Sequence, residues 1–156
     1  MDITLVKTRV SDLDTLFLFQ LDKEANDLAA FTTKDPSNKE AYITKYTKLV
    51  NDPKIHNKTI YLDNKIVGSI AKFEMEGQAE LTYWIDKNHW GKGIATKALT
   101  EFLKIETSRP IYGRAASDNI GSRKVLEKCG FKSIGTDKGF ANARGKKIEE
   151  TIYKLV

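Results

Sequence analysis

The sequence predicts an α/β fold of the mixed, α+β kind, in which a central sheet of about seven strands is flanked by about four helices. Two observations support this prediction. Segments with the period-2 pattern of strands alternate with segments of helical period, in the order β-α-α-β-β-β-α-β-α-β-β. No internal repeat and no linker interrupts the 156 residues. We therefore expect a single domain over residues 1–156, long enough to bury a sizeable core.

The first third of the chain predicts one strand and two helices. Residues 2–6 alternate as a strand does, and Ser11 can cap a helix whose apolar positions recur at helical spacing. After Pro36, Ser37 and Glu40 form an S-x-x-E capping box that begins a second helix. The positions expected on the buried faces of these two helices are Leu13, Leu16, Phe17, Leu21, Tyr42, Tyr46, Leu49 and Val50.

The middle of the chain predicts three strands. Those at 59–62 and 66–73 are joined by Asp63-Asn64-Lys65, in which Asp and Asn tolerate the positive φ that a tight hairpin turn requires. The strand at 80–85 is rich in aromatic and β-branched residues.

The last third begins with a glycine-bearing turn and a helix that has one apolar stripe. Residues 110–116 then predict a strand, and residues 119–129 predict a helix that ends at Gly130. The chain closes with two strands and the loop between them: 131–135, 149–155 and 142–147.

Composition argues against several classes of protein. The 26 Lys and Arg are mixed along the chain with 21 Asp and Glu, so the net charge of +5 forms no basic stripe of the kind that binds nucleic acid. No apolar run approaches the ~18 residues of a membrane span, and no signal peptide is visible. The lone Cys129 has no disulfide partner and no cluster of metal ligands around it. We expect a cytoplasmic protein with no metal and no nucleic-acid or membrane partner.

The turn Trp90-Gly91-Lys92-Gly93-Ile94-Ala95-Thr96 has the features of an anion-binding site. Its glycines let a ligand approach the backbone closely, and the N–H groups at a helix start lack partners within the helix. Those donors and the positive end of the helix dipole favour a phosphate. A bare helix-start turn can have the same Gly-x-Gly spacing, so the motif alone leaves that alternative open.

Two nucleotide-binding motifs fit this turn poorly. The P-loop G-x-x-x-x-G-K-[ST] needs a wider separation than Gly91 and Gly93 have. The dinucleotide fingerprint G-x-G-x-x-G needs a small residue where Thr96 stands. It also needs an acidic residue at the end of a strand about 20 residues on, where this sequence predicts helix.

The turn instead resembles the [R/Q]-x-x-G-x-[G/A] pattern of the GCN5-related N-acetyltransferase (GNAT) family, with Trp90, Gly93 and Ala95 at the first, fourth and sixth positions. Tryptophan at the first position is common in the RimJ/RimL-like branch, which acetylates the N-termini of ribosomal proteins. A second segment, Asn119 to Phe131, is similar to the family's N-x-x-[A/S]-x-x-x-[Y/L]-x-k-x-G-F motif. The resemblance is sharp over residues 80–134 and looser elsewhere.

This resemblance implies an enzyme that moves an acetyl group from acetyl-CoA to a primary amine by direct attack in a ternary complex. It also implies that the strand at 80–85 splays from its neighbour, so that the pantetheine arm pairs with main chain near Ile85. A main-chain N–H there would face the thioester oxygen. The residues expected to bind coenzyme A are Trp84, Ile85, Trp90, Gly91, Lys92, Gly93, Ile94, Ala95, Thr96 and Asn119.

Three side chains are candidates for catalysis: Glu80, Asn119 and Ser122. Many family members protonate the leaving thiolate with a tyrosine where this chain has Leu126, and the tryptophan-bearing branch suggests Ser122 instead. Ser122 can equally pack or cap a helix. Glu80, at the start of the splayed strand and pointing into the cleft, is the candidate base through a water, or an ordinary solvated carboxylate. Asn119 is expected near the sulfur, and it is also a preferred N-cap.

Other features leave alternatives open. Histidine often transfers protons near neutral pH, but the place of His89 in the turn favours a surface imidazole, and His56 lies in a predicted polar loop. The acceptor, a small amine or a protein N-terminus, is expected to bind between the first two helices and residues 136–148. The competing function is an acyl-CoA-binding sensor or interaction module that has lost catalysis. The protein is expected to be a monomer or a homodimer.

Overall fold

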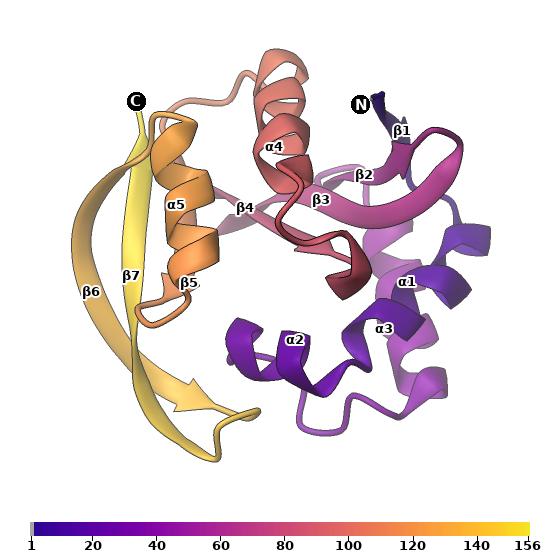
Figure 1. Ribbon diagram of the computed structural model, residues 1–156, viewed down its shortest axis with the longest axis horizontal. Coiled ribbons are helices and arrows are strands. Elements are labelled where there is room, and N and C mark those ends of the chain that lie inside the picture. The colour runs from indigo at the N-terminus through magenta and orange to yellow at the C-terminus, as the bar shows by residue number, and fades with distance from the viewer. Residues whose placement is uncertain (1) are drawn as a thin grey trace.

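A seven-stranded mixed sheet forms the centre of the computed structural model, which describes residues 2–156 (Figure 1). Its strands are Ile3–Lys7 (β1), His56–Leu62 (β2), Lys65–Met75 (β3), Gln78–Ile85 (β4), Ile111–Ala116 (β5), Lys132–Ala141 (β6) and Lys146–Leu155 (β7). They lie in the order β1-β2-β3-β4-β5-β7-β6. All neighbours are antiparallel except β4 and β5, which are parallel. The predicted fold class is confirmed.

In residues 2–156, five α-helices accompany the sheet, whereas about four were expected. They are Leu13–Gln20 (α1), Lys23–Ala29 (α2), Lys39–Asn51 (α3), Ile94–Ile105 (α4) and Ile120–Lys128 (α5). Two 3₁₀ turns, Val10–Asp12 (η1) and Lys87–His89 (η2), precede α1 and α4. The unexpected α2 has only seven residues and no sustained apolar stripe, so periodicity could not reveal it. No helix within residues 2–156 has the length and apolar character to cross a membrane.

The helices cover the two faces of the sheet, as the alternation of β2 shows. Ile60 points into the main core, where it lies among apolar side chains of α4 and α5. Its neighbour Thr59 points the other way, and its hydroxyl donates to the Asp12 carboxylate beside α1 at 3.0 Å. Because successive side chains of a strand face opposite sides, α1 and α4 must lie on opposite faces. Figure 1 shows α4 and α5 together, with α1 and α3 apart from them.

The predicted capping residues of the first two expected helices are wrong. Ser11 lies inside η1, and α1 begins at the second residue after it. At α3 the cap is Asn38, whose side chain accepts from a main-chain N–H of the first turn. Ser37 instead donates its hydroxyl proton to Asp35 at 2.7 Å. Two adjacent residues could each cap this helix, and the loop geometry selects the second.

The predicted buried faces are confirmed in α1 and only half confirmed in α3. Leu21 is 41% exposed because it follows the last helical turn. In α3 no residue is fully buried; Tyr42 and Tyr46 stack with ring centroids 4.3 Å apart, on the outer layer of the molecule. The positions of α1 that are buried as expected are Leu13, Leu16 and Phe17.

The hairpin between β2 and β3 forms as predicted, with positive φ of 50° at Asp63 and 74° at Asn64. Most strands extend beyond their predicted ends. The strand β2 begins at His56, so the expectation that this histidine lies in a polar loop is wrong. The final hairpin is also longer than predicted, because β6 and β7 leave only residues 142–145 between them.

The predicted splay is present between β4 and β5. These strands pair only at Ala79 with Ile111 and at Glu80 with Tyr112. Beyond Glu80, β4 continues to Ile85 bonded to β3 alone, so one edge of its main chain is free of strand partners. This free edge leads directly toward the glycine turn and the start of α4 (Figure 1).

Candidate active site

Of the α-helices in residues 2–156, α1 and α4 begin without a capping side chain. The caps Asp22, Asn38 and Asn119 serve α2, α3 and α5. Gly93 takes this place in α4, with a left-handed φ of 77°. Among residues 2–156, the first α4 amide with an acceptor is that of Lys97, which donates to Gly93 O at 3.1 Å. The amides before it belong to Ile94, Ala95 and Thr96.

The surroundings of these amides are open. A Cβ added at Gly91 or Gly93 would meet no atom within 4 Å, and Lys92 between them is exposed. The start of α4 thus has free amides, the positive end of a helix dipole and an open approach. Together these features suit the binding of an anionic group such as a diphosphate. The α4 turn, residues 90–96, therefore has the geometry that the sequence motif predicted.

Trp90 joins the α4 turn to the end of β4. Its indole Nε1–H donates to Ile85 O at 3.0 Å, although 38% of the residue is exposed. The side chain of Ile85 is buried in the main core, so only its main chain can face a ligand. Sequence reasoning placed Trp90 in the motif but could not foresee this bond, which holds the anion turn against the splayed strand.

His89 is not a surface imidazole, contrary to expectation. Its side chain is only 12% exposed, and Nδ1 lies 3.2 Å from Asp86 Oδ2. Asp86 also accepts the Asn88 amide and so caps η2. The pair shapes the loop between β4 and the α4 turn, and within residues 2–156 it makes no hydrogen bond to the candidate catalytic residues.

Ser122 lies in the first turn of α5, and its hydroxyl contacts a residue that sequence reasoning did not select. Tyr83 Oη lies 2.7 Å from Ser122 Oγ. Tyr83 shares the face of β4 that carries Leu81 and Ile85, and burial raises the pKa of its phenol to about 12. Alternation along β4 placed Tyr83 on this face, but nothing in the sequence named its partner.

Asn119 has both ends of its amide engaged. Its Oδ1 accepts the Ser122 amide at 3.2 Å, which confirms the predicted N-cap. Its Nδ2 donates to Leu28 O in α2 at 3.2 Å. The residue therefore fixes the start of α5 and ties α2 to it.

Glu80 is buried, not at an open strand end. The residue is 2% exposed, and Oε1 accepts from Arg114 Nε at 3.3 Å. Arg114 in turn donates to Glu150 Oε1 at 3.0 Å. Within residues 2–156 the other oxygen, Oε2, is buried without a partner, and so is the indole Nε1 of Trp84 on the same face of β4. A buried polar atom without a partner is costly, so both atoms favour a water or a ligand on this face of β4.

An open cavity of about 840 Å³ lies between α2 and the turn that joins β6 and β7. The predicted acceptor region included residues 136–148, and this part is consistent with the cavity. The helical wall, however, comes from α2 and not from the two helices expected. The residues that line it are Asp22, Lys23, Glu24, Asp27, Leu28, Lys87, Asp118, Ala143, Arg144 and Lys146.

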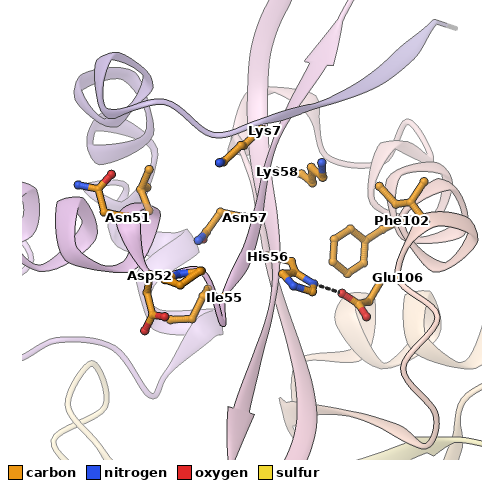
Figure 2. Close-up of a pocket in the computed structure, with 12 residues that line it drawn as sticks. Lys7, Asn51, Asp52, Ile55, His56, Asn57, Lys58, Phe102 and Glu106 are labelled. Carbon is orange, nitrogen blue, oxygen red and sulfur yellow. Dashed lines mark hydrogen bonds and ion pairs between the residues drawn. The ribbon is translucent and has the colours of Figure 1, made fainter.

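A second cavity, of about 420 Å³, lies away from these residues, at the start of β2 and the end of α4 (Figure 2). His56 Nδ1 there contacts Glu106 Oε1 at 2.5 Å. None of the predicted site residues lines this cavity. Within residues 2–156, no group of three or more His, Cys, Asp or Glu is placed to hold a metal ion.

Comparison with known proteins gives the class that this geometry defines. The profile of the acetyltransferase (GNAT) domain family matches residues 2–132. The chain therefore belongs to this family and is an acetyltransferase. Acetyl-CoA is the co-substrate of the family, as the motifs predicted.

Individual relatives align with nearly the whole length of this chain. The uncharacterized N-acetyltransferase p20 of Bacillus licheniformis is 24% identical over 169 aligned positions, which cover 99% of this chain and 92% of that protein. The microcin C7 self-immunity acetyltransferase MccE, solved with acetyl-CoA and AMP, has a TM-score of 0.83 at 20% identity and covers 99% of this chain and 92% of its own. The ribosomal L7/L12 α-N-protein acetyltransferase RimL, solved with coenzyme A, has a TM-score of 0.80 at 17% identity, with 99% and 93% covered. At identities of 20% and 17%, the similarity of this chain to the two structures is one of fold.

Proposed function

We propose that this chain transfers the acetyl group of acetyl-CoA to a primary amine, with both substrates bound together and the amine attacking the thioester directly. The observation that carries the proposal is the uncapped start of α4 beside the free edge of β4. The first can hold a diphosphate, and the second offers main-chain groups to an extended pantetheine arm. Trp90 holds the two together through Ile85.

The candidate catalytic groups lie on opposite faces of β4. Glu80 shares its face with Trp84, and Ser122 meets the other face through Tyr83. Direct attack requires a proton to leave the amine and another to reach the departing sulfur. We assign the first role to Glu80 Oε2, through a water. Ser122 Oγ serves the second through a hydrogen bond to the departing sulfur, which receives its proton through water. A main-chain N–H on the free edge of β4 would stabilise the oxyanion.

The cavity beside α2 is our candidate for the acceptor site. Its wall includes Asp27, whose carboxylate has no ion pair in the described part of the chain, and which would attract a cationic amine. RimL is named for a protein N-terminus, whereas MccE was solved with the small molecule AMP. We propose either a protein N-terminus or a small amine as acceptor, in the cytoplasm, with the chain acting as a monomer or homodimer.

We also propose that residues 1–156 act as a single N-acetyltransferase domain. The family profile ends at residue 132, but β7 lies between β5 and β6 in the same sheet. The sheet would therefore be incomplete without the last residues of the chain.

The second candidate function is an acyl-CoA sensor without catalysis. Leu126, which stands where many relatives have a catalytic tyrosine, is 1% exposed. It packs so closely on Gly113 that an added Cβ would lie 2.9 Å from Leu126 Cδ2. This position belongs to the core and offers no acid, which favours the sensor.

One experiment separates the two functions. The protein is incubated with acetyl-CoA and a panel of amines that contains peptides with free N-termini, amino acids and small polyamines, while free thiol is followed. We expect amine-dependent thiol release with at least one class. Peptides blocked at the N-terminus are the matched control and should release none. Tight binding of acetyl-CoA without amine-dependent release from any class would favour the sensor.

A further inference from the structure

The Tyr83 hydroxyl crosses the splay between β4 and β5 to reach α5. Tyr83 lies beyond the last β4–β5 pair at Glu80 and Tyr112. Its Oη lies 2.7 Å from Ser122 Oγ and 3.3 Å from Ser122 O. The two hydroxyls thus meet beside the stretch of β4 that has no partner in β5, which is where the thioester must lie if its arm follows the free edge of β4.

The distances indicate that the hydroxyl of Ser122 is the main hydrogen-bond partner of Tyr83. Hydrogen bonds between oxygens are usually about 2.5–3.0 Å long. The contact to Ser122 Oγ lies within that range and the contact to the carbonyl does not. Either hydroxyl can be the donor in the short contact. In the arrangement in which Tyr83 donates to Ser122 Oγ, the proton of Ser122 is free to point to another acceptor.

We propose that Tyr83 is a positioning residue for acetyl transfer, which orients and polarises the Ser122 hydroxyl so that its proton points to the departing sulfur. This inference rests on the proposed function. It adds Tyr83 of β4 to the proposed role of Ser122. It also explains how a serine can assist the departure of the sulfur in a chain that lacks the family's usual catalytic tyrosine.

The phenol acts by donating a hydrogen bond and keeps its own proton. Burial raises the pKa of Tyr83 to about 12, whereas an ordinary thiol has a pKa of ~8.5. Full transfer of the tyrosine proton to sulfur would leave a buried phenolate, and it would be strongly uphill. In the step itself the C–N bond forms, the C–S bond breaks and the electron pair leaves on sulfur. That sulfur is stabilised by the Ser122 proton and finally takes the proton released by the amine, through water.

The test compares Tyr83→Phe, Ser122→Ala and the double variant in a single-turnover assay of thiol release with saturating acetyl-CoA and amine. We expect Tyr83→Phe to slow release about three- to tenfold, the usual effect of one such hydrogen bond. The KM for acetyl-CoA should stay within about twofold of the wild type. In the Ser122→Ala background, the same change should have no further effect, because the two residues act as one unit.

Tyr153→Phe is the matched control. Tyr153 is also a buried tyrosine whose hydroxyl bonds α5, through Glu127 at 2.6 Å and Arg123 at 3.0 Å, and in residues 2–156 it makes no hydrogen bond to Ser122 itself. We expect this variant to lower the melting temperature and leave the rate of release unchanged.

The outcomes are distinct. Unchanged release in Tyr83→Phe, or an equal loss in both backgrounds, would overturn the positioning role while the acetyltransferase proposal stands. Slower release in Tyr83→Phe with unchanged release in Ser122→Ala would overturn it too. A wild type that releases no thiol with any amine would instead remove the proposed function on which the inference rests.

Discussion

Gly93 and Gly77 show how one residue type has different consequences at two places. Gly93 has a φ of 77° at the start of α4, and Gly77 has a φ of 79° in the turn between β3 and β4. A Cβ at either glycine would meet nothing within 4 Å. Any side chain at these positions costs roughly 1–2 kcal/mol of backbone strain. Only Gly93, however, stands beside free helix-start amides.

The first prediction concerns these two glycines. Gly93→Glu should weaken coenzyme A binding by roughly a hundredfold or more, because it places a carboxylate and a bulky side chain where the phosphates approach. Isothermal titration calorimetry measures this directly. Gly77→Glu, with the same strain and the same charge, should bind coenzyme A as the wild type does. Wild-type affinity in Gly93→Glu would remove the phosphate site from the α4 turn.

At the scale of elements, α2 is the segment that most depends on its neighbours. It ends at Ala30, whose φ of 63° and ψ of −59° form a tight γ-turn with Phe31 N bonded to Ala29 O at 2.7 Å. Such a strained turn persists at a non-glycine residue only when its surroundings fix it. Ala30 is fully buried beside Ala116 and Ala141.

Three polar bonds hold α2 over the candidate acceptor cavity. Lys87 of η2 contacts Glu24 at 2.6 Å, and Arg144 of the β6–β7 turn donates to Asp27 O at 2.6 Å. The third is the bond from Asn119 Nδ2 to Leu28 O. All three partners lie far from α2 in the sequence. The helix is therefore a product of its docking, and its short sequence alone gives it little stability.

Two variants of Asn119 separate its roles as cap and tie. Asn119→Asp keeps a good N-cap for α5 but has no donor for Leu28 O, whereas Asn119→Ala loses both. We expect faster amide hydrogen exchange over residues 23–29 in both variants. Loss of the cap should lower the free energy of unfolding by about 1 kcal/mol more in Asn119→Ala. Unchanged exchange in Asn119→Asp would show that the hydrogen bond from Asn119 to Leu28 O does not hold α2 in place.

At the scale of the whole molecule, the His56–Glu106 pair joins residues that are 50 positions apart, at the start of β2 and the end of α4 (Figure 2). Burial of Glu106 opposes its charge, but hydrogen bonds from His56 and from Ser108 outweigh it and hold the pKa of the carboxyl below its usual value. A carboxyl with a lowered pKa in the folded state stabilises the fold above its unfolded pKa of ~4.3. That contribution is lost as the pH falls through the lowered value.

Glu106→Gln should therefore lower the free energy of unfolding at pH 7 by about 1.5 kcal/mol or more, since it weakens hydrogen bonds to a charged group. The difference from the wild type should shrink below about pH 4, where the wild-type carboxyl also loses its charge. Urea unfolding at several pH values measures both effects. Glu101 forms an exposed ion pair with Lys104 on the same helix and serves as the control. Glu101→Gln should change the free energy of unfolding by less than about 0.5 kcal/mol. A constant deficit at all pH values would contradict the charge-based explanation.

The sequence by itself determined the features that depend on near neighbours: the succession of the seven strands along the chain, the Asp63-Asn64 hairpin, the glycine turn before α4 and the Asn119 cap of α5. Local conformational preference fixes each of these within a few residues. It misplaced the cap of α3 because two adjacent polar residues compete there, and it expected a cap at α1, which follows η1 directly and has no capping side chain. It missed α2, which has too few residues to show a period.

Only the tertiary structure decided which distant groups meet at the site. Tyr83 and Ser122 are 39 positions apart, and Glu80 and Arg114 are 34 positions apart. Contacts of this kind arise from the registers of β4 and β5 and from the place of α5 beside them, which no local pattern encodes. The motifs could therefore predict coenzyme A and a family. The fold decided that Glu80 is buried against an arginine, and that the hydroxyl of the serine in α5 meets the hydroxyl of a tyrosine from the splayed strand.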